Sequence, residues 1–430
     1  MKRKKYTAAM LGLLASTTLL LTGCGANTDT NTGGKTTLTL WHNSTTGEGK
    51  EYWEKTAIDF EKDNPGTVVK IQPIQNEDMD GKLQTALNSG DAPDIFMARG
   101  GGKLADIVEA DQVLDITDSL DPSLEGAIGQ GVLSAFEVDG KLYGMPIAVL
   151  PGGIFYNKDI FTEAGIETPP TTVSELESDS SAIKELGTSA IALGAKDAWP
   201  AAHWYYFFAL RNCSQDTINA TAKAKNFNDS CWLKAGKDLE AFMQSEPFND
   251  GALTTSAQQG AGSSAGLVAN NKAAMELMGA WNPGVIASLT PDQKPLASLS
   301  WFAFPEVTGG KGEPGAMMGG VDGYSCSAQA PKKECTAFLN FIAQKQQQEN
   351  YASAFHTLPA NKEAQQAVTD PSLQSILAAY NDAPYVMVWL DTLYGQGVGN
   401  ALNSAVVDLL AQKGTPEDIV KAVNNAWTRG

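Results

Sequence analysis

Histidine, cysteine and positive charge are scarce in this chain of 430 residues. Its three histidines, His42, His203 and His356, stand far apart, and no Cys-x-x-Cys pair occurs, so the ligand spacing of a zinc site is missing. The 31 Lys and Arg residues are outnumbered by 49 Asp and Glu, which leaves a formal charge of -18. Because the ligand spacing is missing, we expect no bound metal. Because such acidity repels a phosphate backbone, we also expect no nucleic-acid partner.

Sequence signatures of common enzymes are also missing. There is no Gly-x-Ser-x-Gly nucleophile elbow, no His-Glu-x-x-His pair and no dinucleotide fingerprint after a predicted strand. The run Gly100–Lys103 lacks the spacing of a phosphate-binding loop, and the glycine-rich segment 260–266 is predicted to be a flexible loop. We therefore expect no cofactor and no enzymatic activity. A glycoside hydrolase is the main alternative, because its two carboxylates have no fixed spacing in sequence, and a surface adhesin is a further one.

The one long apolar run lies at the N-terminus. Residues 8–21 follow Lys2, Arg3, Lys4 and Lys5 and end at Leu21-Thr22-Gly23-Cys24. The run is too short to span a bilayer comfortably, and the pattern is that of a secretory signal. The last four residues resemble a bacterial lipobox. This resemblance implies that residues 1–23 are removed and that a lipidated Cys24 holds the protein on the extracellular face of the cytoplasmic membrane.

Residues 24–35 are rich in Asn, Thr, Asp and Gly, and we expect them to form a flexible tether. Removal of the signal takes away four positive charges and no acids, so the formal charge shifts from -18 to -22. This acidity favours solubility and is uninformative about a neutral ligand.

The cysteines other than Cys24 form an even set, as an exported protein with disulfides requires. Three pairings of Cys213, Cys231, Cys326 and Cys335 are possible. We expect the local one, Cys213 with Cys231 and Cys326 with Cys335, which closes two short loops.

About 400 mature residues exceed what one hydrophobic core usually organises, so we expect two domains. From residue 36 the chain alternates predicted strands at 37–41, 68–74 and 94–98 with amphipathic helices at 50–62 and 79–89. This alternation predicts an α/β domain with a largely parallel sheet. Ligands bind beyond the carboxyl ends of such strands, and the polar residues there are Asn43, Asn76, Glu77, Arg99 and Lys103.

Several motifs together carry a family resemblance. They are Leu40-Trp41-His42-Asn43, the run Asn88 to Asp94, Leu142-Tyr143-Gly144-Met145-Pro146, and Phe155-Tyr156-Asn157-Lys158-Asp159 followed by Phe161 and Ala164-Gly165. As a set they resemble the extracellular solute-binding proteins of ABC sugar importers, the family that includes maltose-binding protein. The strings Gln75 to Asp78, Lys196 to Tyr206 and Trp389 to Asn400 are further similar to xylobiose and xylo-oligosaccharide binding lipoproteins of actinobacteria.

The resemblance implies a type II periplasmic-binding-protein fold, in which the chain crosses several times between two α/β lobes. Residues that permit such crossings lie at Ala148–Gly153, at the glycine-rich Gly315–Gly323, and near Pro371–Ala378. The expected boundaries are 36–149 and 323–370 for lobe one, and 150–322 and 371–430 for lobe two.

An aromatic wall is expected in lobe two. The stretch Lys196–Arg211 contains Trp199, Trp204, Tyr205, Tyr206, Phe207 and Phe208, and Pro200 suits the first turn of a helix there. We assign Phe207 and Phe208 to the core. Trp199 and Trp204 are expected to face the cleft, together with Trp281, where the family often places a stacking tryptophan. Further on, Trp389 with Leu393 and Asp391 with Tyr394 lie on different helical faces, and either face could be the one in the cleft.

Sugar recognition would explain these residue types, because aromatic planes bind the C–H faces of a pyranose while charged and amide groups bind its hydroxyls. The polar candidates are Asn43, Asn76, Glu77, Arg99, Lys103, Asp197, His203, Asp322 and Asp391, and the aromatic ones are Trp199, Trp204, Trp281, Trp389 and Tyr394. We expect a monomeric receptor that delivers xylo-oligosaccharides, with or without arabinose side groups, to an ABC permease. Raffinose, galactoside and malto-type ligands are the alternatives.

Overall fold

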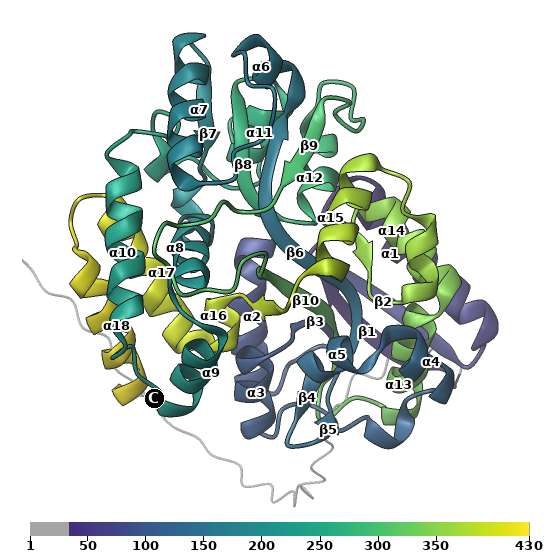
Figure 1. Cartoon of the computed structure of the whole chain (residues 1–430). Helices are drawn as coiled ribbons and strands as arrows, with labels where there is room; N and C mark the ends of the chain where they lie inside the picture. The colour runs from purple at the N-terminus through teal and green to yellow at the C-terminus, as the bar shows by residue number, and fades with distance from the viewer. Residues whose placement is uncertain (1–33, 430) are drawn as a thin grey trace, which may run out of the picture. The chain divides into compact units, whose positions relative to one another are not determined.

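One long strand, β6 (Met145–Asn157), links two half-sheets in the computed structural model, which describes residues 34–429. Its first half pairs antiparallel with β10 (Met317–Cys326), and its second half pairs antiparallel with β8 (Ala273–Gly279) and β9 (Leu299–Phe302). Figure 1 shows β6 running from one half-sheet to the other. The secretory signal, Cys24 and the tether up to residue 33 lie outside the described residues.

The first half-sheet has the strand order β2-β1-β3-β10-β6, with β11 also paired to β6. β1 runs parallel to both β2 and β3, so the alternation of strands and helices predicted from the sequence is confirmed. Its elements are β1 (Thr36–His42), α1 (Gly47–Asp63), β2 (Thr67–Pro73), α2 (Asn76–Ser89), β3 (Ile95–Arg99), α3 (Gly102–Glu109), α4 (Pro122–Ile128), α5 (Gln130–Leu133), β4 (Glu137–Val138), β5 (Lys141–Leu142), α13 (Lys332–Ala343), α14 (Lys345–Phe355) and β11 (Leu358–Pro359).

The second half-sheet has the order β6-β8-β7, and β9 pairs with the same half of β6. Its elements are α6 (Lys158–Glu163), α7 (Val173–Glu185), β7 (Ser189–Ala192), α8 (Trp199–Asn212), α9 (Gln215–Ala224), α10 (Ser230–Met243), α11 (Ser264–Ala269), β8, α12 (Asn282–Leu289) and β9. The chain then ends with α15 (Pro371–Asp382), β12 (Val386–Val388), α16 (Leu390–Leu393), α17 (Gln396–Leu410) and α18 (Pro416–Arg429).

The first two predicted crossings fall where β6 and β10 pair, with Val149 opposite Val321 and Pro151 opposite Gly319. The third predicted crossing, 371–378, lies in helix α15, which contacts β9. Downstream of that helix, β12 adds a parallel strand to β10. The lobe boundaries themselves remain a proposal.

Helix α8 is buried along almost its whole length, from Pro200 to Asn212. It packs between α10, α17 and β8, which encloses it on several sides (Figure 1). A helix that is hydrophobic all round must lie inside the protein. The buried hydrophobic residues form two clusters, and α8 contributes many residues to the second, which we call the second core. Phe207 and Phe208 are each 1% exposed, which confirms their assignment to the core.

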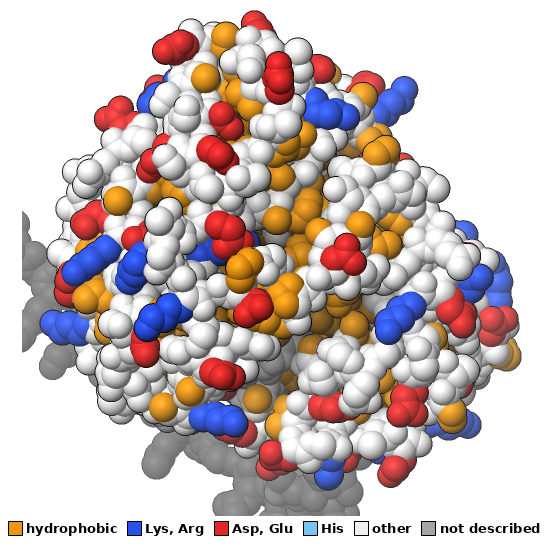
Figure 2. All heavy atoms as spheres, in the orientation of Figure 1, with side chains coloured by type: hydrophobic (Ala, Val, Ile, Leu, Met, Phe, Trp, Pro, Cys, Tyr) orange, Lys and Arg blue, Asp and Glu red, His pale blue; other side chains and the backbone are white. Residues whose placement is uncertain are grey.

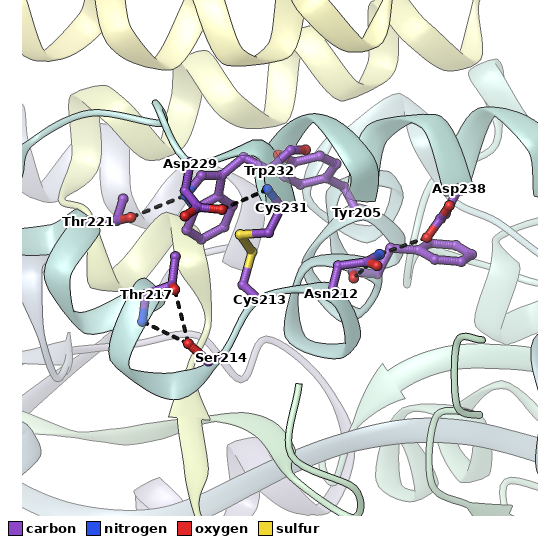
Figure 3. The surroundings of a disulfide bond; sticks show 11 residues. Tyr205, Asn212, Cys213, Ser214, Thr217, Thr221, Asp229, Cys231, Trp232 and Asp238 are labelled. Atoms are coloured by element: carbon purple, nitrogen blue, oxygen red, sulfur yellow. Dashed lines mark hydrogen bonds between the residues drawn. A yellow bond between two sulfur atoms is a disulfide. The ribbon is translucent and has the colours of Figure 1, made fainter. Parts of the chain in front are cut away.

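The expected disulfide pairing is confirmed. Cys213–Cys231 joins the end of α8 to the start of α10, and Cys326–Cys335 joins the end of β10 to α13. Figure 3 shows the first bond between two capped helices: Ser214 accepts from the backbone N–H of Thr217, and Asp229 accepts from that of Cys231. The bond therefore fixes the relative position of segments that the helix caps already order.

One buried carboxyl group interrupts the core of the second half-sheet. Glu276, in the middle of β8, is 1% exposed and accepts a hydrogen bond of 2.8 Å from Asn282 Nδ2, at the start of α12. Its Oε1 has no partner among the described residues. Burial raises the pKa of Glu276 to about 7, against the opposing hydrogen bond from Asn282.

We predict that this carboxyl group makes stability depend on pH. The folded protein holds the proton up to about pH 7, whereas the unfolded chain releases it near pH 4.5, so the free energy of unfolding falls as pH rises between these values. The loss is on the order of 3 kcal/mol. Glu276→Gln removes it, so urea unfolding should show the variant gaining stability relative to wild type between pH 5 and pH 8. A difference in the free energy of unfolding between variant and wild type that stays constant with pH would contradict the prediction. Glu240→Gln, at an exposed position, is the control.

Candidate functional site

A cavity of about 1280 Å³ is lined by segments that follow strands of both half-sheets. Twelve of the fourteen residues proposed from the sequence line it. From the first half-sheet and β10 come Asn43, Asn76, Glu77, Arg99, Lys103 and Asp322; from the remaining segments come Asp197, Trp199, His203, Trp281, Trp389 and Asp391. Residues distant in sequence are thus brought to one site, as expected for the carboxyl ends of strands in an α/β fold.

Four rings form a cluster on one wall of this cavity. His203 stacks on Trp389 with ring centroids 4.2 Å apart and planes inclined by 7°. Trp281 meets Trp389 edge to face at 6.1 Å, and Trp199 meets Trp281 in the same way at 6.0 Å. Such edge-to-face and stacked pairs are favourable arrangements of aromatic quadrupoles, so the cluster is a rigid platform. We call Trp199, His203, Trp281 and Trp389 the ring cluster.

The position of Trp389, which the sequence left open, depends on two glycines. A side chain at Gly152 on β6 or at Gly320 on β10 would collide with the indole. The absence of a Cβ at both places lets Trp389 lie against the paired strands and still line the cavity, although it is only 6% exposed. Trp389 is therefore both part of the core and part of the ring cluster.

Several polar atoms of the cavity wall are buried and have no partner among the described residues. They are the indole N–H groups of Trp199 and Trp281, Nδ1 of His203 and Oε1 of Glu77. Leaving such groups unsatisfied costs about 1–3 kcal/mol each, so they are the natural partners for hydroxyl groups of a ligand. Burial lowers the pKa of His203 to about 4 in spite of the opposing Asp391, so its ring is neutral near pH 7.

On the other wall, the two cations at the strand ends are already paired. Arg99 donates to Asn76 Oδ1 at 2.9 Å and lies 3.5 Å from Asp80 and 3.7 Å from Asp322. Lys103 is 2.9 Å from Asp80 and 3.9 Å from Asp391. Together these contacts hold the amide and carboxylate groups of the cavity in place.

Asp80, which the sequence analysis missed, is central to that network. Burial by itself would raise the pKa of Asp80, but Arg99 and Lys103 outweigh it and lower the value to about 2. The available signal was its position one helical turn after Asn76 and Glu77 on α2.

Asp197 lines the cavity but is partly committed elsewhere. Its Oδ2 accepts a hydrogen bond of 2.7 Å from the backbone N–H of Ala257, so this oxygen holds a neighbouring loop. Between Asp197 and Trp199 the chain turns sharply at Ala198, whose φ of 63° and ψ of -51° are rare for a residue with a side chain. That turn delivers Trp199 to the cavity at the first position of α8.

Two of the proposed site residues do not line the cavity. Trp204 is 1% exposed and stacks on Phe242 at 5.2 Å, with Phe248 and Phe304 against its edges. Tyr394 packs against Phe227, Trp232 and Trp427. Both residues belong to the second core, because aromatic rings from other elements surround them, and helical spacing alone does not record such contacts. We correct the candidate set accordingly.

Much of the remaining lining was not predicted from the sequence. Further lining residues are Glu48, Glu51, Ile147, Gln258, Gln259, Lys294, Tyr324, Tyr351, Phe355, His356, Asn400 and Asn403. Most of them come from helices and loops in which no local sequence pattern predicts a binding site. The segment 396–404 had one signal, a row of amides at helical spacing in α17.

Among residues 34–429, no group of three or more His, Cys, Asp or Glu side chains is arranged to hold a metal ion. No helix in that part of the chain is long and apolar enough to cross a membrane. On the face shown in Figure 2, acidic and basic side chains are scattered, and hydrophobic ones gather near the centre.

Comparisons with known proteins agree on one family. A family model described as bacterial extracellular solute-binding protein matches residues 43–349. A solved protein from work on xylan utilization by the thermophilic bacterium Caldanaerobius polysaccharolyticus has a TM-score of 0.83 and 26% identity, covering 90% of this chain and 99% of that one. A chitin oligosaccharide binding protein has a TM-score of 0.82 and 25% identity, covering 92% and 99%. The melibiose/raffinose/stachyose-binding protein of Bacillus subtilis is 24% identical, over 96% of this chain and 94% of its own length.

The placement of Trp204 gives a prediction about stability. Trp204→Ala deletes a fully buried ring and should lower the free energy of unfolding by about 3–5 kcal/mol. Trp281→Ala removes a half-buried ring on the cavity wall and should cost much less. Denaturant unfolding of both variants checks this, and equal losses would contradict the division between the core and the cavity wall.

Proposed function

Because the chain belongs to the family of bacterial extracellular solute-binding proteins, we propose that it captures an oligosaccharide in the cavity between its half-sheets and delivers it to an ABC importer. Its family and relatives are substrate-binding proteins rather than enzymes. Closure of two lobes around the ligand would bury the sugar and signal occupancy to the permease.

The observation that carries the proposal is the ring cluster facing a wall of carboxylates and amides. Stacked and edge-on rings offer apolar planes for sugar C–H faces, and their unpartnered N–H groups lie where hydroxyls can accept from them. A volume of about 1280 Å³ exceeds the usual range for one small ligand, about 300–1,000 Å³, and suits an oligosaccharide better than a monosaccharide.

The charges of the site favour a neutral ligand. Arg99 and Lys103 contact three carboxylates, those of Asp80, Asp322 and Asp391, so neither cation is left to pair with an acidic group of a ligand. An anionic ligand would have to displace these contacts and face the surplus carboxylate.

We propose xylo-oligosaccharides, with or without arabinose side groups, as the ligand class. Support comes from the resemblance of three sequence strings to xylo-oligosaccharide binding lipoproteins and from the likeness to a protein studied for xylan utilization. Receptors for raffinose-type and chitin-derived sugars are about equally similar in sequence, so a raffinose, galactoside or malto-type ligand is the alternative.

We also propose that a lipid on Cys24 anchors the receptor to the extracellular face of the membrane, where it works as a monomer beside its permease. The lipobox pattern supports the anchor. Residues 36–149 and 323–370 would form lobe one, and residues 150–322 and 371–430 lobe two.

Calorimetry with xylobiose, xylotriose, arabinosyl-xylotriose, maltotriose, raffinose and galactobiose tests the ligand class. We expect the xylosides to bind with a dissociation constant near or below about 1 μM, which corresponds to about -8 kcal/mol. If maltotriose or raffinose bound tightly and the xylosides did not, the proposed specificity would be wrong, whereas the proposed receptor function would stand. Shortened xylotriose after incubation would refute the receptor in favour of a hydrolase.

Trp281→Ala should weaken binding of the preferred saccharide by about 2 kcal/mol, roughly thirtyfold, because it removes the ring and its N–H from the cavity wall. Trp427→Ala is the matched control, since Trp427 is also half-buried but packs against Phe227 and Tyr394 away from the cavity. If the two variants bound the saccharide with equal affinity, the proposed role of Trp281 in ligand binding would be wrong.

A further inference from the structure

The loop 255–263 precedes α11 in the second half of the fold and contributes to the cavity wall. Gln258 and Gln259 at its tip line the cavity wall. The sequence predicted that the glycine-rich end of this region is flexible, but Ser263 caps α11 through the N–H of Gly266. Close packing of Gly266 against the carbonyl group of Gly260 leaves no room for a side chain there.

Both ends of this loop are tied to their own half of the protein. At one end the N–H of Lys196 donates to the carbonyl of Thr255 at 3.1 Å, and Asp197 accepts from Ala257. At the other end the N–H groups of Ser264 and Ala265 donate to the carbonyls of Ser256 and Ala257 at 2.9 and 3.1 Å, and Ser264 Oγ donates to Ala257. The loop is therefore a preordered arm rather than a freely moving lid, and only its tip is available for other contacts.

The tip makes one hydrogen bond to the first half-sheet. Gln259 Nε2 donates to Glu77 Oε2 at 2.9 Å, although the two residues lie 182 positions apart. Glu77 lies in the first turn of α2, which follows β2, so this bond joins an arm of the second half-sheet to a helix of the first. Both partners line the cavity, and Glu77 is next in sequence to Asn76, which hydrogen-bonds to Arg99 and Asn43.

The two carboxylate oxygens of Glu77 have different surroundings, because only Oε2 accepts from Gln259. Oε1 is buried, has no partner among the described residues, and belongs to a side chain that lines the cavity. A carboxylate accepts through both oxygens, so Oε2 can hold the arm while Oε1 accepts from a ligand hydroxyl. The same side chain can thus contact the arm and the ligand together.

We propose that Gln259 and Glu77 form a latch that retains bound oligosaccharide, with Glu77 joining the 255–263 arm to a hydroxyl of the ligand. This inference rests on the proposed function, since it needs a sugar in the cavity. A hydroxyl donating to Oε1 orients the carboxylate and keeps Oε2 directed at Gln259. The closed arrangement and the occupied cavity therefore stabilise each other.

The arm shares its attachment with the ring cluster. Asp197 holds Ala257 and lies two residues before Trp199, with the sharp turn at Ala198 between them. The segment that anchors the arm is therefore the one that places Trp199 at the cavity, so the latch and the ring cluster share one attachment.

Because the hydrogen bond is at the surface and reaches a charged acceptor, its loss should have a modest effect that falls on dissociation. We expect Gln259→Ala to raise the dissociation rate of the bound saccharide about three- to tenfold and to change the association rate less than twofold. Stopped-flow tryptophan fluorescence on the full-length receptor measures both rates, with xylotriose, maltotriose and raffinose as probes.

A double-mutant cycle identifies the partner. Glu77→Ala should raise the dissociation rate more than Gln259→Ala, because it also removes the ligand contact, and Gln259→Ala should add nothing in the Glu77→Ala background. Gln72→Ala, an exposed glutamine on β2 outside the cavity, is the matched control and should dissociate like wild type.

The outcomes separate the two hypotheses. Saccharide binding with an unchanged dissociation rate in Gln259→Ala, or strictly additive effects of the two substitutions, would overturn the latch and leave the receptor intact. Failure of every probe to bind would refute the proposed function itself. Unchanged melting temperatures of the free variants, together with faster dissociation, would support a latch over a structural role.

Discussion

The pairing of β6 with β10, beside the point where β6 passes from one half-sheet to the other, supports the rest of the site. Gly319 and Gly320 lie opposite Pro151 and Leu150, and the N–H of Trp389 donates to the carbonyl of Gly319 at 3.0 Å. Gly152 and Gly320 leave room for the Trp389 indole, so backbone pairing determines where that ring lies. His203 then stacks on Trp389 from α8, and Trp281 meets it edge to face. Any movement of the crossing strands would therefore be felt directly by the ring cluster.

The two walls of the cavity have different chemistry because they are built differently. Helix α8 is buried all round, so its first turn can present Trp199 and His203 on a rigid base. The opposite wall consists of strand ends and the start of α2, where Arg99, Lys103 and Asp80 organise one another by charge. One wall offers apolar planes with unpartnered N–H groups and the other offers oriented acceptors, which is the complement of a sugar's faces and rim.

Membership of the solute-binding family explains why this arrangement needs no catalytic geometry. The cavity is lined from both half-sheets, which suits the capture of a ligand proposed above and does not require an acid and a nucleophile across one bond. The buried carboxyl of Glu276 likewise has a structural role and is not among the residues that line the cavity. It bonds Asn282, the residue after Trp281, so it supports the ring cluster from the core side and has no access to the cavity lining.

The sequence by itself determined the α/β alternation, both disulfides, the family and twelve residues of the cavity lining, because strand ends, cysteine spacing and local motifs are short-range signals. Tertiary structure decided what those signals cannot contain. Trp204 and Trp199 are five residues apart in α8, yet one is in the core and the other at the cavity, because the helix is buried from Pro200 onward and only Trp199, its first residue, is partly exposed. Trp389 took its place from glycines on two distant strands, and the glycine-rich loop became an ordered arm through bonds to Asp197 and α11. Such outcomes depend on contacts between segments far apart in sequence, which no local pattern records.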